Sequence, residues 1–367
     1  MLKNICFILS FLLLSHTSYA VIDKRENHQW QSKKNDILAV GQAVYDIIYK
    51  FDDEEKHLQY LKSVKVPKGE SVVISKDIAE KISRDLKPIS KQLGGSVNNT
   101  AAGLANLGTR VSFLGSVAYD NLGKQYIEAI EKYRIYSLIR KVNSSKETGV
   151  VNIIISPDGE RTMLAYPGIS RDLPPLDYKI IKDYKIILLE GYLWHEDGDD
   201  DTLKEFLHMA KNNEVITAFT FGSYEQVKKY QKKWSELIKE IDIIFSDREQ
   251  IYALFKNTNW DEVVNNLQKY DTIFVVTDNK NGAHIIYRDQ KIYIPAYNIK
   301  YITDTTGAGD QFAAGFLYGF LNNYDLEKCG QFGTKTAAKI IQQIGAKPLK
   351  ITKLNSEKSL FKQYTLK

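Results

Sequence analysis

The order of apolar runs along the chain restricts its fold more than any other feature of the sequence. From Asp36 onward, short apolar runs alternate with longer stretches whose apolar residues recur every three or four positions. The short runs are typical of buried strands, which we expect at residues 37–40, 111–117, 186–190, 215–220, 241–246, 273–277 and 283–287. The longer stretches predict helices at residues 121–134, 202–212, 225–239, 260–270 and 308–322. This alternation predicts an α/β fold with a mostly parallel sheet and helices on both faces.

Two regions depart from this alternation. Residues 44–51 with 71–74, and residues 149–155 joined to 161–166 by a Pro-Asp-Gly turn, show the period-two pattern of antiparallel strands. We expect them to form a small second sheet, and small sheets beside an open α/β core often act as lids. The predicted domain covers residues 36–350, with lid strands around 44–51, 71–74 and 149–166.

The first twenty residues have the three parts of a secretory signal peptide. Lys3 supplies a positive charge, residues 5–14 form an apolar run, and Ser18-Tyr19-Ala20 places small residues before a cleavage point that follows Ala20. The run is too short to span a bilayer. A misassigned start codon is the alternative, although the next methionine, Met163, lies far inside the expected fold. We expect an exported or periplasmic protein if the signal is cleaved, and a cytoplasmic protein otherwise.

Charge and cysteine content exclude several classes of protein. The net charge of +5 is spread evenly, and no block of Lys and Arg is dense enough to indicate nucleic-acid binding. The two cysteines, at positions 6 and 329, cannot build a disulfide framework, and no Cys/His cluster has zinc spacing. A mean hydropathy of −0.33 excludes a polytopic membrane protein. After signal cleavage we expect a monomer or homodimer with no membrane contact.

The strongest chemical signal is the segment Asp304-Thr305-Thr306-Gly307-Ala308-Gly309-Asp310, which precedes an apolar helix. Gly-Ala-Gly leaves the backbone uncovered, so amide N–H groups can converge at the helix N-terminus, where the helix dipole adds partial positive charge. The segment predicts a site for a phosphoryl group, with Asp310 placed to take a proton from an attacking hydroxyl. A tight turn in which Asp310 merely complements the dipole is the alternative.

Two weaker signals come earlier in the chain. Gly94 and Gly95 precede an expected helix and allow a ligand to approach the backbone, and Asn99 offers a donor and an acceptor one turn later. Asp46 follows a short strand, where its carboxylate could accept hydrogen bonds from vicinal hydroxyls. Each signal has a structural alternative: helix packing for the glycines and a solvated strand end for Asp46.

Taken in this order, the motifs resemble those of the ribokinase (PfkB) family of carbohydrate and nucleoside kinases, most closely its bacterial adenosine-kinase-like branch. The resemblance runs from about residue 36 to residue 348. It rests on V-G-Q-A-V-Y-D-I (40–47), G-G-S-V-N-N-T-A-A-G (94–103), P-D-G-E-R-T-M (157–163), L-E-G-Y-L-W (189–194) and D-T-T-G-A-G-D (304–310). It implies a ribokinase-like three-layer sandwich with a small β-sheet lid, and the use of ATP and Mg²⁺.

The resemblance also implies roles for individual residues. Asp310 would be the general base that activates a CH2–OH group, and the anion hole would be formed by the amides of Gly307, Ala308 and Gly309. The residues that would hold the acceptor are Asp46, Gly94, Gly95 and Asn99. Arg161 would reach the phosphates from the lid, with a surface salt bridge to Asp158 or Glu160 as the alternative. The residues that would line the nucleotide are Thr277, Gly282, Thr305 and Thr306.

Three features depart from the family pattern. Members usually carry N-x-x-E at the position of Asp247-Arg248-Glu249-Gln250, and the Glu helps to organise magnesium and phosphate. Asp247 and Glu249 each supply a carboxylate here, although neither is the one the family pattern expects, and Asp247 is the predicted metal ligand. The opening Gly-Asn is Gly41-Gln42, which is a milder change. A cleaved signal peptide would also deliver an ATP-dependent kinase to a space with little ATP.

The sequence therefore predicts an ATP-dependent phosphotransferase that moves the γ-phosphoryl group to the primary CH2–OH of an adenosine-like nucleoside or a small sugar. The alternative is an exported pseudokinase that binds a nucleoside or sugar with little turnover. The altered N-x-x-E segment favours the pseudokinase, and the intact D-T-T-G-A-G-D segment favours the enzyme. The identity of the acceptor depends on pocket shape rather than on a motif.

Overall fold

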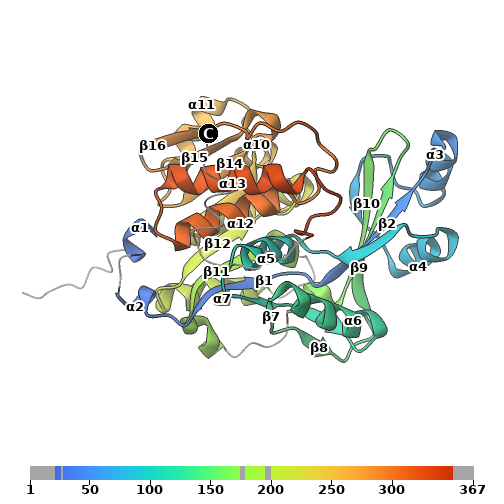
Figure 1. Cartoon of the computed structure of the whole chain (residues 1–367), viewed down its shortest axis with the longest axis horizontal. Coiled ribbons are helices and arrows are strands. Elements are labelled where there is room, and N and C mark those ends of the chain that lie inside the picture. The colour runs from blue at the N-terminus through green and yellow to red at the C-terminus, as the bar shows by residue number, and fades with distance from the viewer. Residues whose placement is uncertain (1–20, 26–27, 174–177, 195–199, 350–367) are drawn as a thin grey trace, which may run out of the picture.

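Alternate residues of strand β1 (Asn35–Val40) are buried on opposite sides of a sheet. Ile37 and Ala39 pack into one apolar cluster, whereas Leu38 and Val40 pack into another. A strand buried on both faces belongs to a sheet that helices cover on both sides. The computed structural model, which describes residues 21–25, 28–173, 178–194 and 200–349, has this arrangement in its large lobe (Figure 1).

The large sheet has nine strands within these ranges. In spatial order they are β16 (Gln290–Ile294), β15 (Ala283–Tyr287), β14 (Ile273–Thr277), β13 (Ile243–Asp247), β12 (Ile216–Thr220), β11 (Tyr184–Glu190), β1, β5 (Val111–Leu114) and β7 (Tyr136–Ser137). Neighbouring strands are parallel from β14 to β7, and β15 and β16 are added at the β14 edge by antiparallel pairing. The prediction of a mostly parallel sheet is confirmed.

Helices cover both faces of this sheet. The helices that share a cluster with Ile37 and Ala39 are α5 (Ser96–Asn106), α6 (Asn121–Ile130), α12 (Ala308–Leu321) and α13 (Leu326–Ile340). The helices that share a cluster with Leu38 and Val40 are α7 (Asp200–Asn212), α8 (Tyr224–Lys229), α9 (Gln231–Leu237), α10 (Arg248–Phe255) and α11 (Trp260–Leu267). Together with the sheet, they form the predicted three-layer sandwich.

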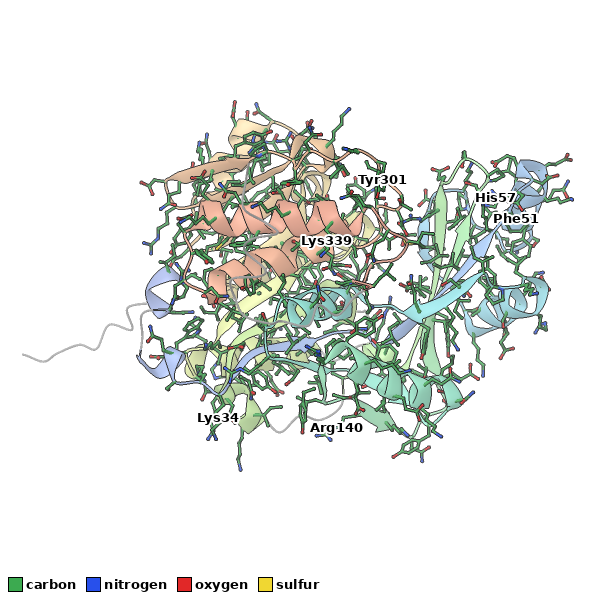
Figure 2. The ribbon with its side chains drawn as sticks, viewed as in Figure 1. Lys34, Phe51, His57, Arg140, Tyr301 and Lys339 are labelled. Carbon is green, nitrogen blue, oxygen red and sulfur yellow. The ribbon has the colours of Figure 1, made fainter. Side chains whose placement is uncertain are left out.

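A five-stranded sheet forms the small lobe, at the right in Figure 1. In spatial order its strands are β3 (Ser71–Val73), β10 (Arg161–Gly168), β9 (Thr148–Ile155), β2 (Val44–Lys50) and β4 (Ser90–Leu93). Its apolar residues pack with helices α3 (Glu54–Ser63) and α4 (Lys76–Asp85) in a core of their own. Phe51 and His57, labelled in Figure 2, lie in this lobe with ring centroids 5.4 Å apart.

The pairing within the small sheet corrects the expectation of purely antiparallel strands. β9 and β10 form the expected hairpin, but β2 pairs with β9, and β10 with β3, in parallel. The fifth strand, β4, pairs antiparallel with β2 and was not expected, because Ser-Lys-Gln-Leu lacks an apolar period. Parallel pairing joins segments far apart in the sequence, so no local pattern indicates it.

Two predicted elements of the large lobe are interrupted. The strand expected at 111–117 divides into β5 and β6 (Ser116–Ala118), which pairs with β8 (Arg140–Val142). The division falls at Gly115, where a Cβ atom would lie 2.7 Å from the Gly41 carbonyl oxygen, so the close approach of two backbones bends the strand. The helix expected at 225–239 divides at Tyr230 into α8 and α9.

The segment that follows the predicted cleavage point packs against the large lobe. It carries the short helices α1 (Val21–Lys24) and α2 (His28–Gln31). Trp30 is buried and donates its indole N–H to the Lys185 carbonyl at 3.0 Å. The predicted signal peptide itself, residues 1–20, lies outside the described residues, as does residue 350. Within the described ranges, no helix has both the length and the apolar character needed to cross a membrane.

Candidate active site

A cavity of about 140 Å³ lies where the carboxyl ends of β12, β13 and β14 face the N-termini of α5 and α12. This crevice is the usual ligand site of open α/β sheets. The residues that line it include four predicted site residues, which are Asp247, Thr277, Gly309 and Asp310. The fold therefore brings together residues from three distant segments of the chain.

The N-terminus of α12 opens toward this cavity. Gly307 is the residue that caps the helix, with φ +76°, and a Cβ atom there would lie 2.5 Å from the Cβ of Ala346. Gly309 is exposed, and a Cβ atom there would meet nothing within 4 Å. The amide of Ala308 donates at 3.2 Å to the Thr305 carbonyl, so an anion would have to compete for that donor. The predicted anion hole is most open at Gly309.

Asp310, in the first turn of α12, is held by two side chains of α5. Its carboxylate accepts hydrogen bonds from the Ser96 hydroxyl at 2.6 Å and from the Asn99 amide at 2.8 Å. Burial raises the pKa of Asp310, whereas these two hydrogen bonds and the charge of Lys347 oppose the rise. A carboxylate with a raised pKa is a better proton acceptor for a hydroxyl group.

Asp46 of β2 lies at the start of α5, the helix whose Ser96 and Asn99 side chains donate to Asp310. It packs on the backbone of Gly94, where a Cβ atom would lie 2.1 Å from the Asp46 Oδ1 atom, so the site requires a glycine. Gly95 has φ +91°, in the left-handed region that favours glycine. Burial raises the pKa of Asp46, and the charge of Lys347 only partly opposes this effect. The predicted acceptor residues are therefore gathered beside the predicted base.

Arg161 joins the small lobe to the loop that precedes α12. Its guanidinium donates to the Thr306 hydroxyl and to the Asp304 carboxylate. Asp304 also accepts the amides of Thr306 at 2.7 Å and Gly345 at 2.9 Å. Asp158, one of the two expected partners of Arg161, instead pairs with Lys68 at 2.6 Å. Arg161 therefore forms its ion pair with Asp304 and not with Asp158, and it contacts the loop that precedes α12.

The four residues predicted to line the nucleotide differ in their surroundings. Thr277 borders the cavity and donates its hydroxyl to the Ser246 carbonyl at 3.2 Å. Thr305 is exposed on the loop before α12, and the Thr306 hydroxyl donates to Asp304 at 2.6 Å. Gly282, with φ +92°, forms the turn between β14 and β15, where a Cβ atom would lie 2.1 Å from the Ile294 carbonyl oxygen. Backbone geometry by itself explains this glycine.

Asp247 and Gln250 form a reciprocal cap on α10. Asp247 Oδ1 accepts the Gln250 amide at 2.7 Å, and Gln250 Oε1 accepts the Asp247 amide at 3.4 Å. The Gln250 side chain also donates to the Gly222 carbonyl at 3.2 Å. Because a glutamate could not make this last bond, the departure from N-x-x-E suits the local structure. Burial raises the pKa of Asp247.

Glu190 is a buried residue that the sequence did not single out as functional. Its carboxylate accepts the backbone amides of Gln42 at 2.7 Å and Val97 at 3.0 Å, and it therefore ties the turn after β1 to the start of α5. Burial raises the pKa of Glu190 to about 7, although these two hydrogen bonds oppose the rise. The segment L-E-G-Y-L-W marks its position but not its role.

We expect Glu190 to make the stability of the protein depend on pH. Because its pKa in the folded state exceeds the ordinary value of 4.5, the folded protein favours the protonated form. Its contribution to the free energy of unfolding should be complete below about pH 4.5 and lost as the pH rises through about 7. Urea unfolding at a series of pH values should show this decline, and Glu190→Gln should reduce it. The exposed Glu236→Gln control should keep the wild-type slope; equal slopes in all three proteins would contradict the assignment.

The fold is shared with small-molecule kinases. The chain matches the family described as pfkB family carbohydrate kinase over residues 70–353 and belongs to that family. The predicted family, the ribokinase-like fold and the assignment to carbohydrate and nucleoside kinases are confirmed.

Three relatives illustrate the breadth of this similarity. The adenosine kinase from Sinorhizobium meliloti is 30% identical, with a TM-score of 0.81, and the match covers 90% of this chain and all of that one. A probable sugar kinase from Rhizobium etli is 31% identical, with a TM-score of 0.79, over 87% of this chain and 96% of that one. The 5-dehydro-2-deoxygluconokinase from Clostridium perfringens is 29% identical over 72% of this chain and 82% of the relative.

Proposed function

We propose that this protein transfers the γ-phosphoryl group of ATP to a primary hydroxyl of a nucleoside or small sugar, with Asp310 as the general base. The observation that carries the proposal is the position of Asp310. Its carboxylate borders the cavity at the N-terminus of α12. It accepts a hydrogen bond from Asn99, one of the residues predicted to hold the acceptor. A candidate proton acceptor therefore lies between the N-terminus of α12, which suits an anion, and the side chains of Asp46 and Asn99, which suit sugar hydroxyls.

In the proposed reaction, Asp46 and Asn99 hold the acceptor so that its CH2–OH group faces Asp310. The hydroxyl proton passes to the Asp310 carboxylate as the oxygen forms a bond to the γ-phosphorus, and the bond from that phosphorus to ADP breaks. Amides at the N-terminus of α12 stabilise the charge on the phosphoryl oxygens. Phosphoryl transfer depends mainly on such positioning and electrostatic stabilisation.

The residues present fit a magnesium ion bound together with a nucleotide. Within the described ranges, no cluster of three or more His, Cys, Asp or Glu side chains could hold a metal ion by itself. Mg²⁺ in kinases needs no such cluster, since it is held by one or two carboxylates, phosphate oxygens and water. Asp247 would supply a carboxylate at the cavity wall, and the ion would neutralise phosphate charge.

The test is a phosphoryl-transfer assay of the purified protein with Mg-ATP and a panel of nucleosides and sugars. The panel includes adenosine and 5-dehydro-2-deoxygluconate, which the names of two relatives indicate, together with inosine, ribose and fructose. We expect ADP and a phosphorylated product from at least one acceptor. Saturable binding of an acceptor without product would instead support the exported pseudokinase.

The magnesium requirement provides a prediction about Gln250. Gln250→Glu should lower the free magnesium needed for half-maximal rate, because the new carboxylate adds a charge to the cavity wall. It should also lower stability, since the donor to the Gly222 carbonyl is lost. Rates measured against free magnesium, with thermal unfolding of both proteins, test this. Coincident magnesium curves would mean that the altered segment does not limit metal use.

A further inference from the structure

The segment after α13 is hydrogen-bonded to the loop that precedes α12, the helix that carries Asp310. The Ile341 carbonyl accepts the amides of Thr303 at 2.8 Å and Asp304 at 3.2 Å. The Gln311 side chain, one residue beyond Asp310, donates to the Ala346 carbonyl at 3.0 Å. These hydrogen bonds place residue 347 beside residues predicted to hold the acceptor, although it is far from them in the sequence.

Lys347 points into the site from this segment. It is 6% exposed, and its ammonium donates to the side-chain oxygen of Asn99 and to the Leu93 carbonyl. Its charge interacts with the carboxylates of both Asp46 and Asp310. A buried cation beside two carboxylates offsets part of the cost of keeping them ionised.

Asn99 links the cation to the base. Its oxygen accepts from Lys347, while its nitrogen donates to Asp310 at 2.8 Å. An ammonium group can donate but not accept, so it selects the orientation of the amide in which the nitrogen faces Asp310. With a neutral residue at position 347, only the Asp310 carboxylate, which accepts but cannot donate, would hold this orientation of the amide.

We propose that Lys347 is a positioning residue of the acceptor site, where it orients the amide of Asn99 toward Asp310 and supplies the counter-charge for Asp46 and Asp310. This inference rests on the proposed phosphoryl transfer. The titratable groups of the site are Asp46 on β2, Asp310 on α12 and Glu190 on β11, whose charge interacts with that of Asp310. Burial lowers the pKa of Lys347, whereas the negative charges of both aspartates oppose this and favour the ammonium form.

The test compares Lys347→Met, which removes the charge, with Lys347→Arg, which keeps it. Lys347→Met should lower kcat/KM for the acceptor about tenfold or more, the scale of a lost hydrogen bond to a charged group. Its KM for ATP should stay within about twofold, since Lys347 contacts the acceptor side of the site. The acid limb of its pH–rate profile should move up by about one pH unit, because the carboxylates lose an opposite charge. Lys347→Arg should recover part of the rate and restore the acid limb.

The matched control is Lys339→Met, an exposed lysine on α13 that is labelled in Figure 2. It should match the wild type in rate and in pH profile. A purely structural role for Lys347 would lower the melting temperature and leave the acid limb in place, and this result would overturn the proposal.

A second measurement separates the failure of this inference from the failure of the proposed function. Carbon-13 NMR titration of labelled aspartate carboxyls, assigned with Asp46→Asn and Asp310→Asn, needs no turnover. In Lys347→Met both carboxyls should titrate at higher pH than in the wild type. Unchanged titration would overturn the role of Lys347 even in an active kinase. If Lys347→Met does not fold, Lys347→Gln carries the same comparison.

Discussion

Asp310→Asn is expected to lower kcat about 10²–10⁴-fold, which is the usual contribution of general acid–base catalysis. Asparagine keeps the shape of the side chain but cannot accept the proton of the attacking hydroxyl. The hydrogen bonds from Ser96 and Asn99 show that both carboxylate oxygens of Asp310 are oriented by α5. The measurement is the steady-state rate with the best acceptor from the panel, together with acceptor binding by calorimetry.

The variant should fold and bind the acceptor, so the loss should fall on kcat. Asp289→Asn, on the exposed turn between β15 and β16, is the matched control and should retain the wild-type kcat. If Asp310→Asn kept more than about a tenth of the wild-type kcat, Asp310 would not be the base.

Asp46→Ala is expected to raise the acceptor KM about 5- to 150-fold while changing the ATP KM little. A buried hydrogen-bonding partner of this kind contributes about 1–3 kcal/mol, which corresponds to that range. The carboxylate lies on β2, at the small-lobe side of Asp310, and packs on the backbone of Gly94. Its hydrogen bonds should therefore go to the acceptor and not to the nucleotide. Separate KM values for the two substrates test this.

Two further variants make the Asp46 experiment specific. Asp46→Asn keeps the volume of the side chain and should show a smaller rise in acceptor KM. Asp52→Ala removes an exposed carboxylate just beyond the same strand and should change neither KM. Equal increases in both KM values for Asp46→Ala would place the acceptor site elsewhere.

Much of the fold follows from local sequence patterns. Strands β1, β11, β13 and β14 can be predicted from their apolar runs, because a strand buried on both faces needs a continuous apolar segment. The start of α12 can also be predicted from the sequence, because the glycines before it and the carboxylate of Asp310 in its first turn favour a helix N-terminus. The strand predicted at residues 111–117 is an exception. It bends at Gly115, where the backbone of Gly41 approaches, but its apolar pattern continues through the bend, so the sequence does not show the division.

The sequence by itself determined the alternation of strands and helices and marked Asp310 as the candidate base. The tertiary structure decided which residues surround it: Ser96 and Asn99 of α5 contact it, and Lys347 reaches Asn99 from beyond α13. It also decided the parallel pairing of β2 with β9 and the addition of β4. The physical reason is that periodicity reports only whether each residue faces the core or the solvent. Which distant segments share that core, and which buried charges balance one another, depends on the packing of the whole chain.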